Sequence, residues 1–110
     1  MPFETPKCKI TVLKRTIDQD LVDEYLVLED PEGFGPCERF KDGQEFVIER
    51  PFDMPENFCP WAWADIRHDI LTVVLGGDRP WIKQRGTVIA GCTDWFRPVI
   101  FKVKRMEITE

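Results

Sequence analysis

The chain has 110 residues, 43% of them hydrophobic, with four tryptophans and a formal net charge of −5. This length suits a single domain over residues 1–110 that buries roughly two thirds of its unfolded surface, so the fold does not need disulfides to be stable. The hydrophobic content excludes a disordered chain. Residues 16–56 carry thirteen acidic and three basic side chains. Because such a segment repels phosphates, no nucleic-acid partner is expected.

The sequence indicates neither a secretion signal nor a membrane span. Residues 1–10 lack the apolar segment of a signal peptide. The longest apolar run, residues 70–75, is far too short to cross a bilayer. We therefore expect a soluble cytoplasmic protein with no membrane partner. In that reducing compartment its four cysteines are expected to be free, metal-bound or catalytic rather than paired as disulfides.

The first half of the chain predicts a strand, a short helix and a second strand. Residues 7–15 alternate apolar and polar side chains, which is typical of a strand. Asp18 can cap a short helix that ends near Tyr25. A loop rich in glycine and proline, residues 29–36, separates this helix from a second strand over residues 45–49.

The second half predicts one long helix and a pair of strands. Pro60 suits the first helical position, and apolar residues then recur at helical spacing as far as Leu75, before a Gly76-Gly77 stop. Strands are expected over residues 87–92 and 99–104. Together these elements predict an α+β fold: an antiparallel sheet of about four strands that could close into a barrel, with one long and one short helix.

Three of the four cysteines stand out by their local setting. Cys37, Cys59 and Cys92 each adjoin a glycine or proline at a predicted loop or element end, where close backbone N–H groups can bond a sulfur. Cys59 is the strongest candidate, because a thiol at a helix N-cap faces unpaired N–H groups and the positive end of the helix dipole. Cys8, in a strand beside Ile10, is expected to be a packed core residue.

Other residues near these cysteines have both a chemical and a structural interpretation. Asp94 could act as a general acid or base beside Cys92, or bond its own backbone in a turn. Trp61 and Trp95 flank cysteine positions and could wall a binding pocket. Arg97 could hold an anion or pair with Asp94.

The remaining tryptophans and the single histidine are assigned as follows. Trp63 fits the core stripe of the long helix and is expected to pack there, whereas Trp81 could also wall a site. His68, the only histidine, is expected on the solvated side of the helix.

Four blocks of sequence together resemble a family of small uncharacterised cysteine-containing proteins, found largely in anaerobic bacteria and archaea. The blocks are Gly35-Pro36-Cys37, residues 42–46, the run from Phe58 to Asp65, and Cys92-Thr93-Asp94 followed by residues 97–102. The resemblance matches Cys37, Cys59 and Cys92 and omits Cys8. Trp95 stands where many members carry a glycine. The resemblance implies no particular activity, but it supports the same three cysteines.

Three functions are compatible with this pattern. Cys37, Cys59 and Cys92 could bind an iron–sulfur cluster or zinc through three thiolates, leaving one position open for redox or substrate chemistry. Alternatively, Cys59 could be the reactive thiolate of a metal-free thiol or redox protein. The third possibility is a non-catalytic interaction module. Enzymatic and non-enzymatic roles both stay open, and the partner would be a small-molecule substrate or a redox protein.

Overall fold

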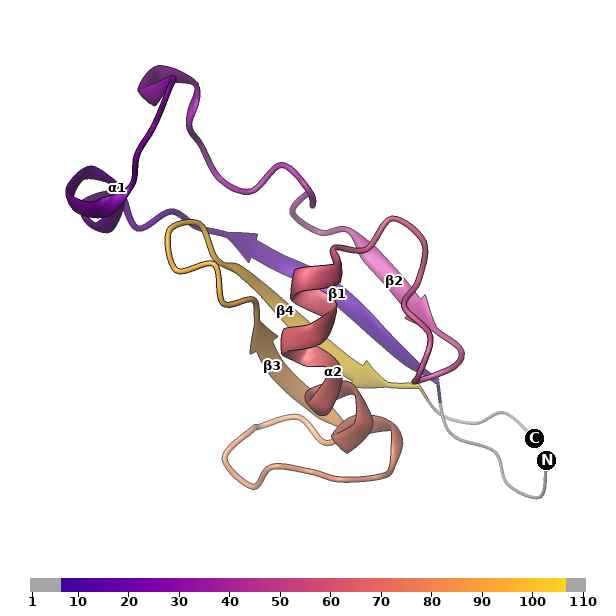
Figure 1. The fold of residues 1–110 in the computed structure, drawn as a ribbon. Coiled ribbons are helices and arrows are strands. Elements are labelled where there is room, and N and C mark those ends of the chain that lie inside the picture. The colour runs from indigo at the N-terminus through magenta and orange to yellow at the C-terminus, as the bar shows by residue number, and fades with distance from the viewer. Residues whose placement is uncertain (1–6, 107–110) are drawn as a thin grey trace.

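The computed structural model describes residues 7–106, which form a four-stranded antiparallel sheet with a long helix on one face (Figure 1). The strands are β1 (Cys8–Arg15), β2 (Glu45–Ile48), β3 (Thr87–Gly91) and β4 (Val99–Arg105), and their order in the sheet is β2-β1-β4-β3. The predicted α+β fold is confirmed. The sheet does not close into a barrel, because β2 and β3 lie at opposite edges.

Alternation along the central strands builds the core. Cys8, Ile10 and Val12 of β1 are buried, and Ile10 lies opposite the buried Val103 of β4. The register between β1 and β4 shifts after Val12, and Leu13 is left exposed. One face of the sheet is thereby apolar and available to a helix. Aromatic rings extend this core in edge-to-face pairs, and the cluster comprises Phe40, Phe46, Phe58 and Phe101.

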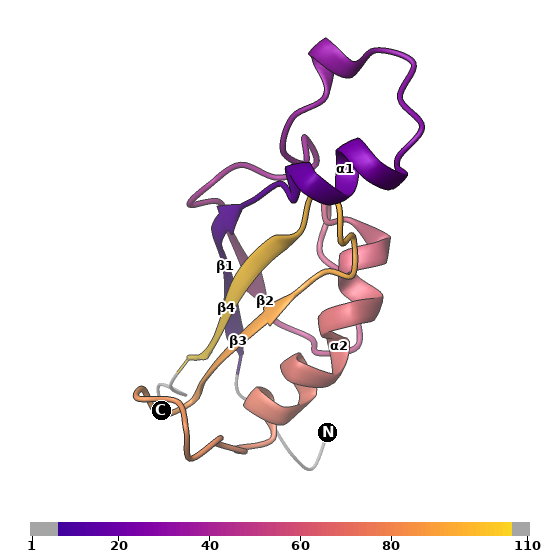
Figure 2. The same cartoon turned by 90° about the vertical axis from the view of Figure 1, so that its left-hand side faces the viewer.

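The long helix α2 (Pro60–Val74) covers the apolar face of the sheet (Figures 1 and 2). Trp63 packs against the core and meets Phe58 edge to face at 6.0 Å, as expected. The helix ends at Val74, and Leu75 is its C-cap. Gly76 follows with φ of +88°, a conformation that glycine adopts without strain. The buried residues of α2 are Ala62, Ile66, Ile70, Val73 and Val74.

A short helix, α1 (Gln19–Tyr25), and a single 3₁₀ turn, η1 (Pro31–Gly33), lie beyond one end of the sheet (Figures 1 and 2). Asp18 occupies the N-cap position of α1 as predicted, but its side chain makes no capping hydrogen bond. Its backbone N–H instead donates to the Phe96 carbonyl at 2.8 Å. This bond ties the start of α1 to the connection between β3 and β4.

No helix formed by residues 7–106 lies on the second face of the sheet (Figure 2). The side chains of this face are mixed. Lys102 of β4 lies opposite the apolar Ile89 of β3, and Lys9 of β1 lies between Val47 of β2 and Lys104 of β4. None of the helices within residues 7–106 combines the length and apolar character needed to cross a membrane.

Candidate functional site

The antiparallel topology brings three cysteines to the same end of the sheet. Cys59 immediately precedes α2, and Cys92 immediately follows β3. Arg15, the last residue of β1, donates from Nη1 to the Cys37 carbonyl at 2.8 Å, and Arg15 also lies opposite Val99, the first residue of β4. All three cysteines are partly buried and pack against the one hydrophobic core.

Cys92 has the most defined surroundings of the three. The Val99 N–H donates to its Sγ at 3.3 Å, while the Cys92 N–H donates to the Val99 carbonyl at 3.2 Å. The two residues thus close the connection between β3 and β4, and a backbone N–H points directly at the sulfur. This is the N–H···S arrangement that glycine-flanked cysteines were expected to make.

Cys59 is the N-cap of α2, as predicted, with extended backbone angles of φ −76° and ψ 123°. Its carbonyl accepts the first helical bond, from the Trp63 N–H at 2.9 Å. The expected capping bond to sulfur is absent, because the side chain makes no hydrogen bond to the first helical turn. The sulfur packs against the hydrophobic core instead.

Cys8 differs from the other three thiols in its environment. Its side chain is fully buried in β1. Burial disfavours the thiolate and raises the pKa of Cys8 to about 12. The expectation that Cys8 is a core residue is therefore confirmed.

The three partly buried thiols share an end of the sheet without forming a ready coordination sphere. Within residues 7–106, no three Cys, His, Asp or Glu side chains form a group that could hold a metal ion. His68 is exposed on α2, as predicted. Metal binding at this end would therefore require the thiols to move closer together.

A hydrogen-bonded chain joins the start of α2 to the connection that follows Cys92. Trp61 Nε1 donates to Thr93 Oγ1 at 2.7 Å, and Thr93 donates from both N and Oγ1 to Asp65 Oδ2, at 2.7 and 2.9 Å. Sequence reasoning missed Asp65 and Thr93. The spacing of Trp61 and Asp65, four residues apart and therefore on one helix face, was the available signal.

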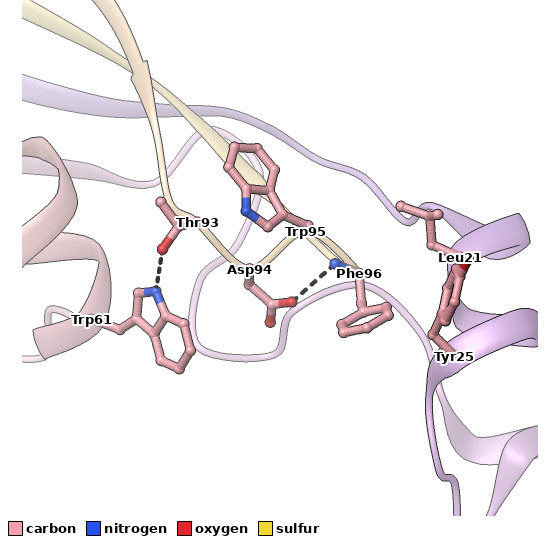
Figure 3. Close-up of a pocket in the computed structure, with 7 residues that line it drawn as sticks. All are labelled: Leu21, Tyr25, Trp61, Thr93, Asp94, Trp95 and Phe96. Atoms are coloured by element: carbon pink, nitrogen blue, oxygen red, sulfur yellow. Dashed lines mark hydrogen bonds between the residues drawn. The ribbon is translucent and has the colours of Figure 1, made fainter.

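A pocket of about 250 Å³ opens beside this chain, between α1 and the first turn of α2. Trp61 and Trp95 both line it, as predicted (Figure 3). Figure 3 shows Trp61 on one side and α1 on the other, with Asp94 and Phe96 between them. The α1 side chains Leu21 and Tyr25, which also line the pocket, were not foreseen. Trp81 is not among the lining residues.

Asp94 occupies a turn and bonds its own backbone. Its Oδ1 accepts from the N–H groups of Phe96 at 3.1 Å and Arg97 at 3.3 Å. Its Oδ2 lies 3.7 Å from Arg97 Nε, so the expected ion pair is present. The Arg97 guanidinium also lies over the Phe34 ring, 5.0 Å from its centroid. These contacts fit the structural interpretation of Asp94, and its role as an acid or base stays a prediction.

Comparison of the chain with models of protein families, with curated proteins and with solved structures found no match. The family resemblance in the sequence is therefore untested.

Proposed function

We propose that Cys37, Cys59 and Cys92 form a thiolate centre that binds an iron–sulfur cluster or a zinc ion. One observation carries the proposal: these cysteines are separated by 21 and 32 residues of sequence, yet all three lie at one end of the sheet and pack on one core. Three thiolates on a four-iron cluster leave one iron open, and three on zinc leave one position for water. The family resemblance involves the same residues.

Backbone groups at two of the three positions suit a metal-bound sulfur. At Cys92 a backbone N–H already points at the sulfur, and such bonds stabilise thiolates and tune metal clusters. Cys59 precedes α2, whose positive dipole end favours negative charge nearby. Both residues sit at the ends of regular elements, so their backbones are well fixed.

Cys37 is the cysteine that would move toward the other two when a metal binds. It lies between η1 and β2, in a stretch without regular secondary structure. Its movement would break no hydrogen bond of the sheet ladder. The Arg15 bond to its carbonyl keeps the segment near the end of β1. A zinc ion would need the sulfurs within about 2.3 Å of the metal, so a modest closure of this segment is part of the proposal.

The aromatic pocket gives the proposed centre a neighbouring place for a small molecule. Trp61 follows Cys59 by two residues, and Thr93 directly follows Cys92. Their mutual hydrogen bond links the cysteine-bearing segments to the pocket wall. A substrate or redox partner that reaches an open metal position would be able to use this pocket.

Anaerobic loading with iron and sulfide, or with zinc, tests the proposal directly. The full chain and the variants Cys37→Ser, Cys59→Ser and Cys92→Ser are compared for bound metal, acid-labile sulfide and visible absorption. Cys8→Ala is the matched control, because it removes a thiol from the core. We expect the wild type and Cys8→Ala to bind equally, and each of the three serine variants to lose most of the bound metal. Equal binding by all five proteins would contradict the proposal.

The position of Cys59 at a helix start keeps a metal-free thiol function as the alternative. That alternative predicts rapid alkylation of Cys59 at neutral pH and no metal retained after loading. Slow alkylation of Cys59 together with metal binding would eliminate it. If a chain with all three serine substitutions keeps its stability and its partners, the interaction module is favoured instead.

A further inference from the structure

A second pocket, of about 500 Å³, lies at the end of the sheet opposite the three cysteines. It is formed where β1 begins, where β4 ends and just before β3. Four of its six lining residues are cationic, and none is acidic. The lining residues are Lys9, Arg85, Gly86, Lys104, Arg105 and Met106.

The sheet register places two of these cations directly opposite each other. Lys9 of β1 pairs with Lys104 of β4 in the antiparallel ladder. Directly opposed side chains have Cβ atoms roughly 4.5–5.5 Å apart, and like charges at such positions destabilise a sheet. The next residues in this row, Val47 beside Lys9 and Thr87 beside Lys104, are uncharged.

Two of the four cations already have acidic partners. Lys9 Nζ lies 2.9 Å from Glu45, and Arg85 Nη1 lies 3.7 Å from Asp78. Within residues 7–106, Lys104 and Arg105 have no carboxylate partner. The described lining of the pocket therefore keeps an excess of positive charge, in a chain whose overall net charge is −5.

The backbone around Gly86 holds one wall of the pocket in place. The Gly86 carbonyl accepts from the Arg105 N–H at 2.7 Å, and Arg105 Nη1 donates to the Val73 carbonyl at 3.3 Å. Gly86 has φ of +65°, and a Cβ there would lie 3.3 Å from Arg105 Nη2. Glycine at this position therefore allows the positive φ of the turn and leaves room for the Arg105 guanidinium.

We propose that this pocket binds a small molecule bearing phosphate groups. Clustered phosphoryl oxygens can accept from Lys104, Lys9 and Arg85, and their charge would offset the Lys9–Lys104 repulsion. The volume suits a small phosphorylated ligand. The strongly acidic segment of residues 16–56 disfavours a long polyanion such as a nucleic acid.

Inorganic pyrophosphate is the probe for the test, titrated by calorimetry at constant ionic strength into the full chain. We expect saturable binding that Lys104→Gln weakens about tenfold, the usual effect of losing one charge-assisted bond. Lys83→Gln is the matched control, because Lys83 is an exposed lysine that does not line this pocket. Glu45→Gln should tighten binding, because it releases Lys9 from its acidic partner.

The melting temperature without ligand and the binding of an oligonucleotide provide two further tests. Without ligand, Lys104→Gln should leave the melting temperature unchanged or raised, because it removes a like-charge pair; a lowered value would contradict the proposed repulsion. Absence of saturable pyrophosphate binding, or equal weakening by Lys83→Gln, would overturn the site. A single-stranded oligonucleotide that binds more tightly than pyrophosphate would overturn the assignment to a small molecule.

Discussion

At the scale of single residues, burial separates one cysteine from the other three. Cys8 is enclosed in the core and its thiol stays protonated well above neutral pH. Cys37, Cys59 and Cys92 are partly exposed, and a backbone N–H points at the sulfur of Cys92. The burial of Cys8 agrees with the sequence analysis, which assigned Cys8 to the core and singled out the other three thiols.

The raised pKa of Cys8 predicts a specific pH dependence of stability. The folded state holds this proton up to about pH 12, whereas a thiol in the unfolded chain has a pKa of 9.0. The stabilising contribution is complete below pH 9 and is lost as the pH rises from 9 toward 12, at about 1.4 kcal/mol per pH unit. Urea unfolding of the wild type and Cys8→Ala across this range measures it. A stability difference that does not change with pH would contradict the prediction.

At the scale of elements, both ends of α2 are defined by contacts that substitution can test. Its start is fixed to the connection after β3 through Trp61, Thr93 and Asp65. Its end depends on the left-handed conformation of Gly76. The first contact positions the proposed site, and the second determines only where the helix stops.

Asp65→Ala should lower the free energy of unfolding by about 1–2 kcal/mol, because two Thr93 donors lose a charged acceptor. His68→Ala, three residues along on the exposed side of α2, is the control and should change it little. Chemical denaturation gives both values. Equal effects of the two substitutions would show that the link between α2 and the connection contributes nothing to stability.

Gly76→Ala should cost about 1 kcal/mol or slightly more, because an L side chain is strained at φ of +88°. Gly35→Ala is the matched control, since a Cβ there meets nothing within 4 Å and its φ lies outside the left-handed region. Thermal melts of both variants are sufficient to compare them. A larger loss for Gly35→Ala would contradict the assignment of the helix stop.

At the scale of the whole molecule, local sequence patterns predict the helices and strands, whereas the residues that meet at the candidate site depend on tertiary contacts. The alternation of residues 7–15 and the stripe from Pro60 gave the strands and long helix within a residue or two. The alternation of apolar and polar residues does not specify strand order, so it cannot distinguish a closed barrel from an open sheet with β2 and β3 at its edges. The role of Tyr25 in the pocket depends on how α1 docks, which no local pattern reports.

The two proposed sites lie at opposite ends of the sheet and should act independently. Cys59→Ser should therefore leave pyrophosphate affinity unchanged within a factor of about two, and Lys104→Gln should leave metal content unchanged. Calorimetry measures the pyrophosphate affinity of both variants, and metal analysis measures their metal content. A large change in either cross-measurement would mean that the ends are coupled through the sheet.

Alkylation followed by mass spectrometry, before and after removal of the metal, tests the central claim most directly. If Cys37, Cys59 and Cys92 bind one metal centre, all three are protected together in anaerobically loaded protein and all three are labelled once a chelator has removed the metal. Cys8 should resist labelling in both states because it is buried. Labelling of any one of the three at the same rate in the loaded and metal-free protein would contradict a shared three-thiolate centre.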